Sequence, residues 1–368
     1  MKDSFFIDNR EYSPKNPLII AELGTSHNGD LAKAMEMICS AAESGADCVK
    51  FQMVFADEIL HPATGEVMLP GGKIRLYDRF KALETPVDFY VKLKEYVENK
   101  GLLFLCTPFG LKSARLLHEL QPKVVKIASP ELNFTGLLKE ISSWNLPVLL
   151  SSGVSLLADI EEAVSVLNAQ NRLCLLHCIT SYPAPETEYN LKVLQSLSMI
   201  FGISAGVSDH SLDPCLVPAL SVSMGAAVIE KHFCLSRDDP GLDDPIALPP
   251  DLFSQMVKAV RKAAETGPEK TIEELSGQYG REFIEQILGN GVKMLAHSEK
   301  ANYQLTNRSI HALRDIEPGQ IIKKGDFAVL RTEKILRPGL APRFEELIEG
   351  RAARNFIPNG EGIRFEDI

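Results

Sequence analysis

The feature that most restricts the fold is a series of eight short apolar segments, rich in β-branched residues, with amphipathic stretches between them. Most of these segments are apolar at consecutive positions, as expected of parallel strands buried on both faces. Successive segments mostly begin 22–31 residues apart, the length of one strand plus one helix. The expected strands cover residues 17–24, 46–53, 102–108, 124–129, 147–153, 173–180, 204–210 and 227–233.

Eight strand–helix units in a row predict an α/β fold, a (β/α)8 TIM barrel. Helical periodicity supports this between the strands, at residues 31–42, 89–100, 158–169, 214–224 and 251–266. Asp30 is placed to cap the first helix and Gly45 to end it. A doubly wound open sheet is the alternative, but no Gly-x-Gly-x-x-Gly follows the first strand.

The chain divides into three parts. Its 368 residues suit one large domain and one small domain. Residues 1–280 are expected to form the barrel, 281–306 a linker and 307–368 a small β-rich domain with Gly- and Pro-containing turns. The polar stretch 267–306 is predicted to be irregular. An unusually long connection follows the second strand, and its segment 61–73 is predicted to cover the substrate, because such loops lie at the catalytic end of a barrel.

Composition excludes several classes of protein. The formal net charge of −10 argues against a general nucleic-acid binder. No apolar run approaches the roughly 18 residues of a membrane helix, and the N-terminus does not resemble a signal peptide. None of the seven cysteines forms a Cys-x-x-Cys pair. We therefore expect a soluble, cytoplasmic protein with reduced cysteines and no membrane or nucleic-acid partner.

Polar residues gather where the expected strands end, which is where barrel enzymes carry their chemistry. A charged or hydroxyl group there costs stability unless it has a partner or a task, and eight such ends favour a task. The candidates are Glu22, Lys50, Gln52, Thr107, Lys126, Ser129, Glu131, Ser151, Ser152, Thr180, Tyr182, Ser208, Asp209, His210, Glu230, Lys231 and His232.

Two groups of these residues suggest specific ligands. His210 and His232 end neighbouring strands and could hold a divalent metal, although two structural histidines would give the same pattern. A cationic cup for a phosphate or carboxylate is predicted from Lys50, Lys126, Thr107, Ser129 and Ser151.

The two glutamates at these ends leave a further choice open. Glu22 and Glu131 could pair structurally with the lysines, or they could act in acid–base catalysis.

The chain resembles the N-acetylneuraminate (sialic acid) synthases, a family that includes legionaminate, pseudaminate and spore-coat polysaccharide synthases. The resemblance covers nearly the whole chain, and its final part matches their antifreeze-like (SAF) domain. The matching motifs are IAELGTSHNG (20–29), VKFQ (49–52), CTPF (106–109), VKIASPE (125–131), LSSG (150–153), HCITSYP (177–183), GVSDHS (206–211), EKHF (230–233), DPGLD (239–243) and RSIHALRDI (308–316).

The resemblance implies condensation of phosphoenolpyruvate with an N-acyl hexosamine such as N-acetylmannosamine, with Mn²⁺ or Mg²⁺ as cofactor. His210 and His232 would bind the metal, and Glu22 and Glu131 would handle protons, in roles that could be exchanged. Residues implied to hold phosphoenolpyruvate are Lys50, Thr107, Lys126, Ser129, Ser151, Thr180 and Ser208. Residues implied to contact the sugar are Gln52, Tyr182, Asp243 and, from the partner subunit of a domain-swapped homodimer, Arg308.

The chain departs from the family pattern in a few places. Pro130 stands where a small residue is more usual, and Thr180 where asparagine is common. Ser152 and Val154 also differ from the usual Thr and Met. Two other functions compete with the synthase: a phosphoenolpyruvate-dependent barrel synthase of 3-deoxy sugar acids, and a non-catalytic saccharide-binding protein. The SAF-like tail disfavours the first, and the polar strand ends disfavour the second.

Overall fold

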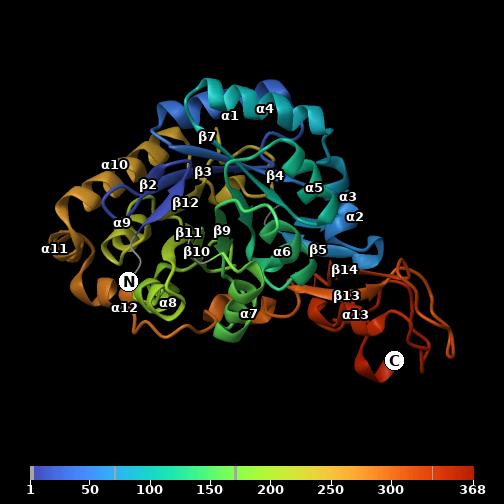
Figure 1. Ribbon diagram of the computed structural model, residues 1–368. Helices are drawn as coiled ribbons and strands as arrows, with labels where there is room; N and C mark the ends of the chain where they lie inside the picture. Colours follow the sequence, from blue (N-terminus) through green and yellow to red (C-terminus); the bar gives the residue numbers. More distant parts are fainter. Residues whose placement is uncertain (1–3, 70–71, 170–171, 334) are drawn as a thin grey trace.

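The computed structural model describes residues 4–69, 72–169, 172–333 and 335–368, and its centre is a parallel sheet rolled into a barrel (Figure 1). The barrel strands are β3 (Leu18–Gly24), β4 (Cys48–Met53), β7 (Leu103–Pro108), β8 (Val125–Ile127), β9 (Val148–Ser151), β10 (Leu173–Cys178), β11 (Ser204–Asp209) and β12 (Val228–His232). They pair in the order β7–β4–β3–β12–β11–β10–β9–β8. Because the end strands β7 and β8 contact each other, the barrel is nearly closed, which confirms the predicted fold.

All eight predicted strands are present, with ends at most two residues inside the predicted ranges. The reason is burial on both faces, since every residue of β3 is buried. Leu18 and Ile20 pack inside the barrel with Leu105, whereas Ile19 and Ala21 belong to the layer under the helices.

A ring of helices surrounds the strands (Figure 1). The first begins after Asp30, whose carboxylate accepts hydrogen bonds from the backbone N–H groups of Ala32 and Lys33, and ends before Gly45, whose φ is 94°. The predicted helices are therefore confirmed. The ring consists of α1 (Leu31–Glu43), α4 (Val87–Asn99), α5 (Leu111–Glu119), α6 (Thr135–Ser142), α7 (Leu157–Leu167), α8 (Val193–Phe201), α9 (Leu216–Ser223) and α10 (Pro250–Thr266).

A short N-terminal hairpin that the sequence pattern did not predict packs against one end of the barrel. It consists of β1 (Phe5–Ile7) and β2 (Arg10–Tyr12), paired antiparallel. Phe5, Ile7 and Tyr12 are buried in one cluster with the inward residues of the barrel strands. Burial of these three side chains closes the end of the barrel that lies opposite the strand C-termini.

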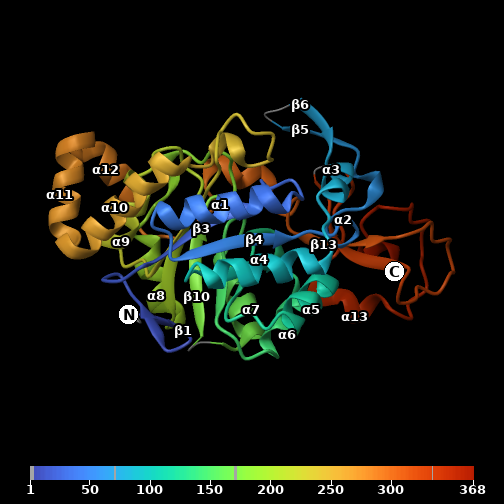
Figure 2. The same cartoon turned by 90° about the horizontal axis from the view of Figure 1, so that it is seen from above.

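The long connection after β4 forms α2 (Ala56–Ile59), the hairpin β5 (Glu66–Leu69) and β6 (Gly72–Arg75), and α3 (Leu76–Ala82). Residues 70–71, which fall within the predicted covering loop, lie outside the described residues. Figure 2 shows the hairpin projecting from the body of the molecule, and α2 packs against the C-terminal domain.

The prediction that residues 267–306 are irregular is wrong for the first half of that stretch. Helix α11 (Pro268–Tyr279) packs beside α9 and α10, and helix α12 (Arg281–Leu288) packs against α11 and the 3-10 helix Glu186–Glu188. The buried residues of α12 are Ile284, Ile287 and Leu288, which form a narrow apolar face within an otherwise polar stretch. Residues 289–307, here called the connector, then lead to the small domain and contain one 3-10 helix, His297–Asn302.

The C-terminal domain is β-rich with turns, as predicted. Its strands β13 (Arg308–Ala312) and β14 (Phe327–Arg331) pair antiparallel, and isolated bridges such as Ile316 to Ile357 extend the pairing. A short helix, α13 (Glu345–Ile348), packs beside them. Among the described residues, no helix combines the length and apolarity needed to cross a membrane.

Candidate active site at the barrel mouth

A cavity of about 180 Å³ lies at the C-terminal ends of the barrel strands. All of the residues with a role implied by the family resemblance line it, except Glu131 and Arg308, whereas the strand-end candidates Ser152, Asp209 and Lys231 do not. The predicted residues that the structure brings together are Glu22, Lys50, Gln52, Thr107, Lys126, Ser129, Ser151, Thr180, Tyr182, Ser208, His210, His232 and Asp243. No described residue of the predicted covering segment 61–73 is among the lining residues, so that part of the prediction is wrong for this structure.

Parallel register explains why these side chains meet. His232 lies opposite Glu22, Glu22 lies opposite Lys50, and Ser208 lies opposite Glu230 on neighbouring strands. Residues at one level of a barrel point into the same layer of its interior. Asp209 and Lys231, one position away, instead pair with each other at 2.5 Å outside the cavity.

The two lysines of the predicted cup share a carboxylate. Lys50 Nζ lies 2.6 Å from Glu230 Oε1 and 3.5 Å from Glu22 Oε2. Lys126 Nζ lies 3.7 Å from Glu230 Oε1 and donates to Ser151 Oγ at 2.7 Å. The lysines therefore pair with Glu22 and Glu230, not with Glu131 as one alternative held.

The shared environment separates the pKa values of the carboxylates. Burial raises the pKa of Glu22 to about 7, against the opposing effect of Lys50. Burial would also raise the pKa of Glu230, but Lys126, Lys50 and the Ser208 hydroxyl hold it at about 2. Burial lowers the pKa of Lys126 to about 8. Near neutral pH, two ammonium groups thus face one permanently ionised carboxylate and one that gains a proton readily.

Two hydroxyls in the cup are without hydrogen-bond partners among the described residues. Thr107 Oγ1 and Thr180 Oγ1 are both buried, and both residues line the cavity. Buried polar groups are ordinarily satisfied, so an unpaired one in a cavity indicates a place for a ligand atom. With the two lysines they form a set of donors suited to the oxygens of an anion.

The two predicted metal ligands lie side by side. The ring centroids of His210 and His232 are 5.5 Å apart. His210 Nδ1 lies 2.7 Å from the carbonyl oxygen of Ile179, which fixes Nε2 as the nitrogen with a free lone pair.

The surroundings of these histidines fit a cation. Burial, with His210 and Lys50 nearby, keeps the pKa of His232 well below its usual value, so the ring is neutral and able to coordinate. No group of three or more His, Cys, Asp and Glu side chains among the described residues is arranged for a metal. The pair therefore fits a divalent cation whose other ligands are substrate or water oxygens.

The predicted sugar contacts gather beside the histidines. Gln52 Nε2 donates to Glu22 Oε1 at 2.7 Å. The Tyr182 ring stacks on His210 with centroids 4.2 Å apart. Asp243 Oδ2 lies 3.8 Å from His232 Nδ1, and burial raises the pKa of Asp243 to about 6. These groups offer hydrogen-bond donors, acceptors and a ring face, the combination that suits a polar organic substrate.

Glu131 and Arg308 lie behind the wall of the cavity. The Glu131 carboxylate is fully buried, and its Oε1 accepts from Arg308 Nε at 3.0 Å and from Arg331 Nη2 at 2.6 Å. Arg308 also donates to the carbonyl oxygen of Phe109. The expectation that Glu131 activates water or holds the sugar is thus not supported, because the residue does not line the cavity and two arginines bind its Oε1.

The place of Arg308 in a partner's active site stays a prediction, and in this structure the residue binds within its own chain. Its guanidinium binds Glu131 of the same chain, because the preceding residue is already tied to this barrel: Asn307 Nδ2 donates to the carbonyl oxygen of Val154. The domain-swapped homodimer stays a prediction.

Sequence reasoning did not assign Cys178 or Arg331 to the site, and it named Glu230 as a strand-end candidate without a role, although all three line the cavity. Glu230 stood at a strand end and could have been recognised as the partner of the lysines. Cys178 looked like a small buried hydrophobe, yet it lines the cavity. Arg331 comes from β14 of the C-terminal domain, and no sequence signal indicated that this strand reaches the barrel mouth.

Comparison with known proteins gives matches over most of the chain. The model of the NeuB family matches residues 37–271, and that of the SAF domain matches residues 307–368. The spore coat polysaccharide biosynthesis protein SpsE of Bacillus subtilis is 35% identical over 99% of this chain and 97% of its own. The N,N'-diacetyllegionaminic acid synthase of Campylobacter jejuni is 34% identical over 93% of this chain and 97% of its own.

Solved structures show the same arrangement of the chain. The crystal structure of Bacillus subtilis SpsE superposes with a TM-score of 0.82 at 33% identity, covering 99% of both chains. The N-acetylneuraminic acid synthetase of Leptospira borgpetersenii, solved with citrate, gives a TM-score of 0.66 at 30% identity and covers 82% of this chain and 95% of its own.

Proposed function

Because this chain belongs to the NeuB family, we propose that it is a nonulosonic acid synthase that condenses phosphoenolpyruvate with an N-acyl hexosamine. In the balanced reaction, C3 of phosphoenolpyruvate attacks the aldehyde carbon of the open-chain sugar and forms the new C–C bond. Water adds to the cationic C2 that results, and the C2–O bond to phosphate breaks. The products are one nine-carbon 2-keto acid and inorganic phosphate.

The cationic cup would hold phosphoenolpyruvate. Lys50 and Lys126 offer ammonium groups to the phosphate and carboxylate, and Thr107 and Thr180 offer their unpartnered hydroxyls. Ser129, Ser151 and Ser208 complete the donor set. Glu230 pairs with both lysines before substrate binds. Its negative charge offsets the repulsion between the two ammonium groups, which can therefore lie close together in the folded protein.

His210 and His232 would hold Mn²⁺ or Mg²⁺ next to the cup. The bound cation would act as a Lewis acid that polarises the sugar aldehyde. Gln52, Tyr182 and Asp243 surround the same place and would orient the sugar through hydrogen bonds and a ring contact. Several of these groups are held in place by neighbouring side chains. The bound substrates would therefore lose little further entropy when the reacting carbons come together.

Glu22 is the residue best suited to move a proton. Its pKa of about 7 lets it gain and lose a proton near neutral pH, and its Oε2 carries no hydrogen bond from the described residues. Gln52 holds the other oxygen, Oε1, in place. In this proposal Glu22 takes a proton from the water that adds to C2, and Glu131 serves to hold the C-terminal domain.

The observation that carries the proposal is the meeting of two buried lysines and two unpartnered hydroxyls with a histidine pair in one cavity. The test is release of phosphate from phosphoenolpyruvate with Mn²⁺ and a panel of N-acyl hexosamines, before and after EDTA. We expect release that requires an acceptor, stops with EDTA and returns with Mn²⁺. Absence of phosphoenolpyruvate binding and of metal binding would overturn the proposal.

A further inference from the structure

The connector contacts the ends of β9 and β10 before it enters the C-terminal domain. Its Glu299 is 1% exposed, although a carboxylate is rarely buried so deeply without a partner. Glu299 Oε2 accepts the backbone N–H of Val154 at 3.0 Å and that of Thr180 at 2.9 Å. One carboxylate oxygen therefore joins the loop after β9 to the loop after β10.

Two asparagines of the connector bind the carbonyl oxygens of the same two residues, Val154 and Thr180. Asn302 Nδ2 donates to the carbonyl oxygen of Thr180 at 2.9 Å. Asn307 Nδ2 donates to the carbonyl oxygen of Val154 at 3.1 Å. Both polar backbone groups of Val154 and of Thr180 are thus bound by the connector, and Val154 is held at a φ of 42°, which is unfavourable for a β-branched residue. We call Glu299, Asn302 and Asn307 the clamp.

The clamped loops form one side of the phosphoenolpyruvate cup. Gly153 precedes Val154, and its N–H donates to Ser129 Oγ at 3.0 Å. A Cβ atom on Gly153 would lie 2.3 Å from Thr180 Oγ1 and 2.9 Å from Ser129 Oγ, so the three strand ends meet with no spare room. Arg308, directly after the clamp, binds Glu131 in the turn that follows β8.

The other side of the cavity is built differently. His232 and Glu22 lie on β12 and β3, and His210 directly follows β11. Among the described residues, the hydrogen bonds of the connector do not reach these strands. Displacement of the connector would thus change the anion cup directly, and it would reach the histidine pair only through the Ile179 carbonyl oxygen beside His210 Nδ1.

We propose that Glu299, Asn302 and Asn307 are positioning residues that fix the phosphoenolpyruvate half of the cavity and make affinity for this anion depend on docking of the C-terminal domain. The identity of the anion rests on the proposed function, whereas the clamp itself does not. The clamp acts through Gly153, Thr180 and Ser129 and touches no reacting atom.

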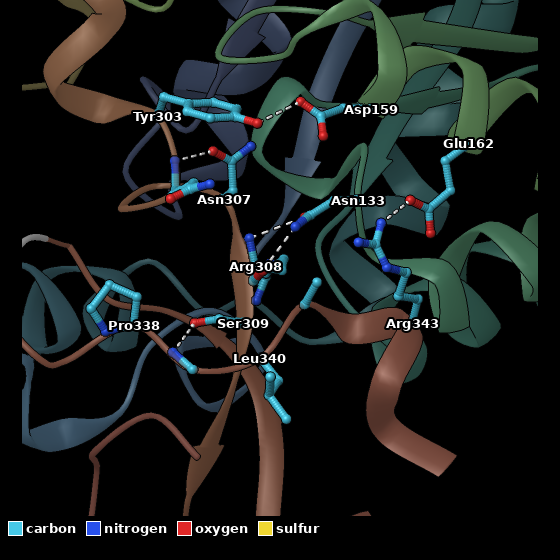
Figure 3. Close-up of a pocket in the computed structure, with 13 residues that line it drawn as sticks. Asn133, Asp159, Glu162, Tyr303, Asn307, Arg308, Ser309, Pro338, Leu340 and Arg343 are labelled. Atoms are coloured by element: carbon cyan, nitrogen blue, oxygen red, sulfur yellow. Dashed lines mark hydrogen bonds and ion pairs between the residues drawn. The ribbon is translucent and has the colours of Figure 1, made fainter. Parts of the chain in front are cut away.

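The test compares Glu299→Gln with Tyr303→Phe. Gln keeps one oxygen but replaces the charge and adds N–H donors that oppose the two backbone N–H groups. Tyr303 belongs to the same connector, and its hydroxyl donates to Asp159 Oδ2 of α7 at 3.0 Å (Figure 3). Neither residue lines the cavity that contains the cup. Tyr303→Phe therefore removes a connector–barrel hydrogen bond without touching the clamp.

Two readouts separate positioning from general loss of structure. Hydrogen–deuterium exchange of peptides covering 152–158 and 178–184 should become roughly tenfold faster in Glu299→Gln, because a hydrogen bond to a charged group is lost at both amides. Phosphoenolpyruvate affinity should fall about tenfold, measured by equilibrium dialysis, and Mn²⁺ affinity should change less, because only the Ile179 carbonyl oxygen links the clamped loop to His210. Tyr303→Phe should alter neither.

Each outcome decides a different question. Unchanged exchange and unchanged affinity in Glu299→Gln would overturn the inference, as would an equal loss of phosphoenolpyruvate and Mn²⁺ affinity. If the wild-type protein binds no phosphoenolpyruvate, the proposed function fails and exchange alone judges the clamp. If Glu299→Gln does not fold, Asn302→Ala, which removes only the bond to Thr180, should speed exchange in 178–184 alone, and no such change would equally overturn the inference.

Discussion

Two carboxylates that line the same cavity, Glu22 and Glu230, differ in proton affinity because their neighbours differ. Glu230 faces both lysines and the Ser208 hydroxyl, so its ionised form is strongly favoured. Glu22 lies farther from Lys50, at 3.5 Å, and burial dominates its pKa. This division of roles could not have been predicted from the sequence, because it depends on distances that differ by about an ångström between residues far apart in the chain.

Replacing Glu22 should therefore change how stability depends on pH. The pKa of Glu22 rises from 4.5 to about 7 on folding, so the native state binds more protons between these values and the free energy of unfolding falls as pH rises through them. In Glu22→Gln this fall in the free energy of unfolding is absent, because glutamine does not titrate. The free energy of unfolding of Glu22→Gln, taken relative to that of wild type, should therefore be up to about 3 kcal/mol higher at pH 8 than at pH 4. Urea unfolding at both pH values would measure this difference. An equal difference at both pH values would contradict the assignment.

Thr107→Val should separate ligand binding from stability. The hydroxyl is buried without a partner, so its replacement by a methyl group should leave stability unchanged or raise it by about 1 kcal/mol. Phosphoenolpyruvate affinity should fall roughly tenfold, because a donor to the anion is lost. The control is Thr271→Val, whose hydroxyl donates to the Gly267 carbonyl oxygen outside the cavity. That variant should lose some stability and keep its affinity for phosphoenolpyruvate.

At the scale of elements, the convergence of β8, β9 and β10 is the tightest part of the site. Gly153→Ala should lower stability by about 1–3 kcal/mol and abolish most phosphoenolpyruvate binding, since the new methyl group must displace Thr180 or Ser129. The matched control is Gly277→Ala in α11, where nothing lies within 4 Å and the change should add roughly 0.5–1 kcal/mol. Thermal unfolding and dialysis would check both. Normal affinity in Gly153→Ala would contradict the described geometry.

Elements that bury continuous apolar runs could be predicted from the sequence, and those that rely on a few side chains could not. The eight barrel strands were predicted because both faces are buried. The hairpin β1–β2 was missed because strands of three residues are too short to show a hydrophobic alternation in the sequence. Helices α11 and α12 were missed because only a narrow face, including Ile284 and Ile287, is apolar within a polar stretch.

For the whole molecule, docking of the C-terminal domain depends on one buried carboxylate. Glu131 pairs with Arg308 and Arg331 across 177 and 200 residues of sequence, a contact that no local pattern could reveal. Glu131→Gln leaves two buried guanidinium groups without a counter-charge and should cost about 3–5 kcal/mol in urea unfolding. Glu346→Gln breaks the exposed pair with Lys139 at the same domain interface and should cost at most about 1 kcal/mol. Equal effects would show that Glu131 does not anchor the domain.

The central claim is that the barrel mouth joins the carbons of phosphoenolpyruvate to a sugar. The most direct measurement is mass spectrometry of the products formed with Mn²⁺, an N-acyl hexosamine and phosphoenolpyruvate labelled with ¹³C at every carbon. The account predicts one new acid whose mass equals that of the sugar plus pyruvic acid, with all of the label retained. Recovery of the label only as free pyruvate, with the sugar unchanged, would contradict it.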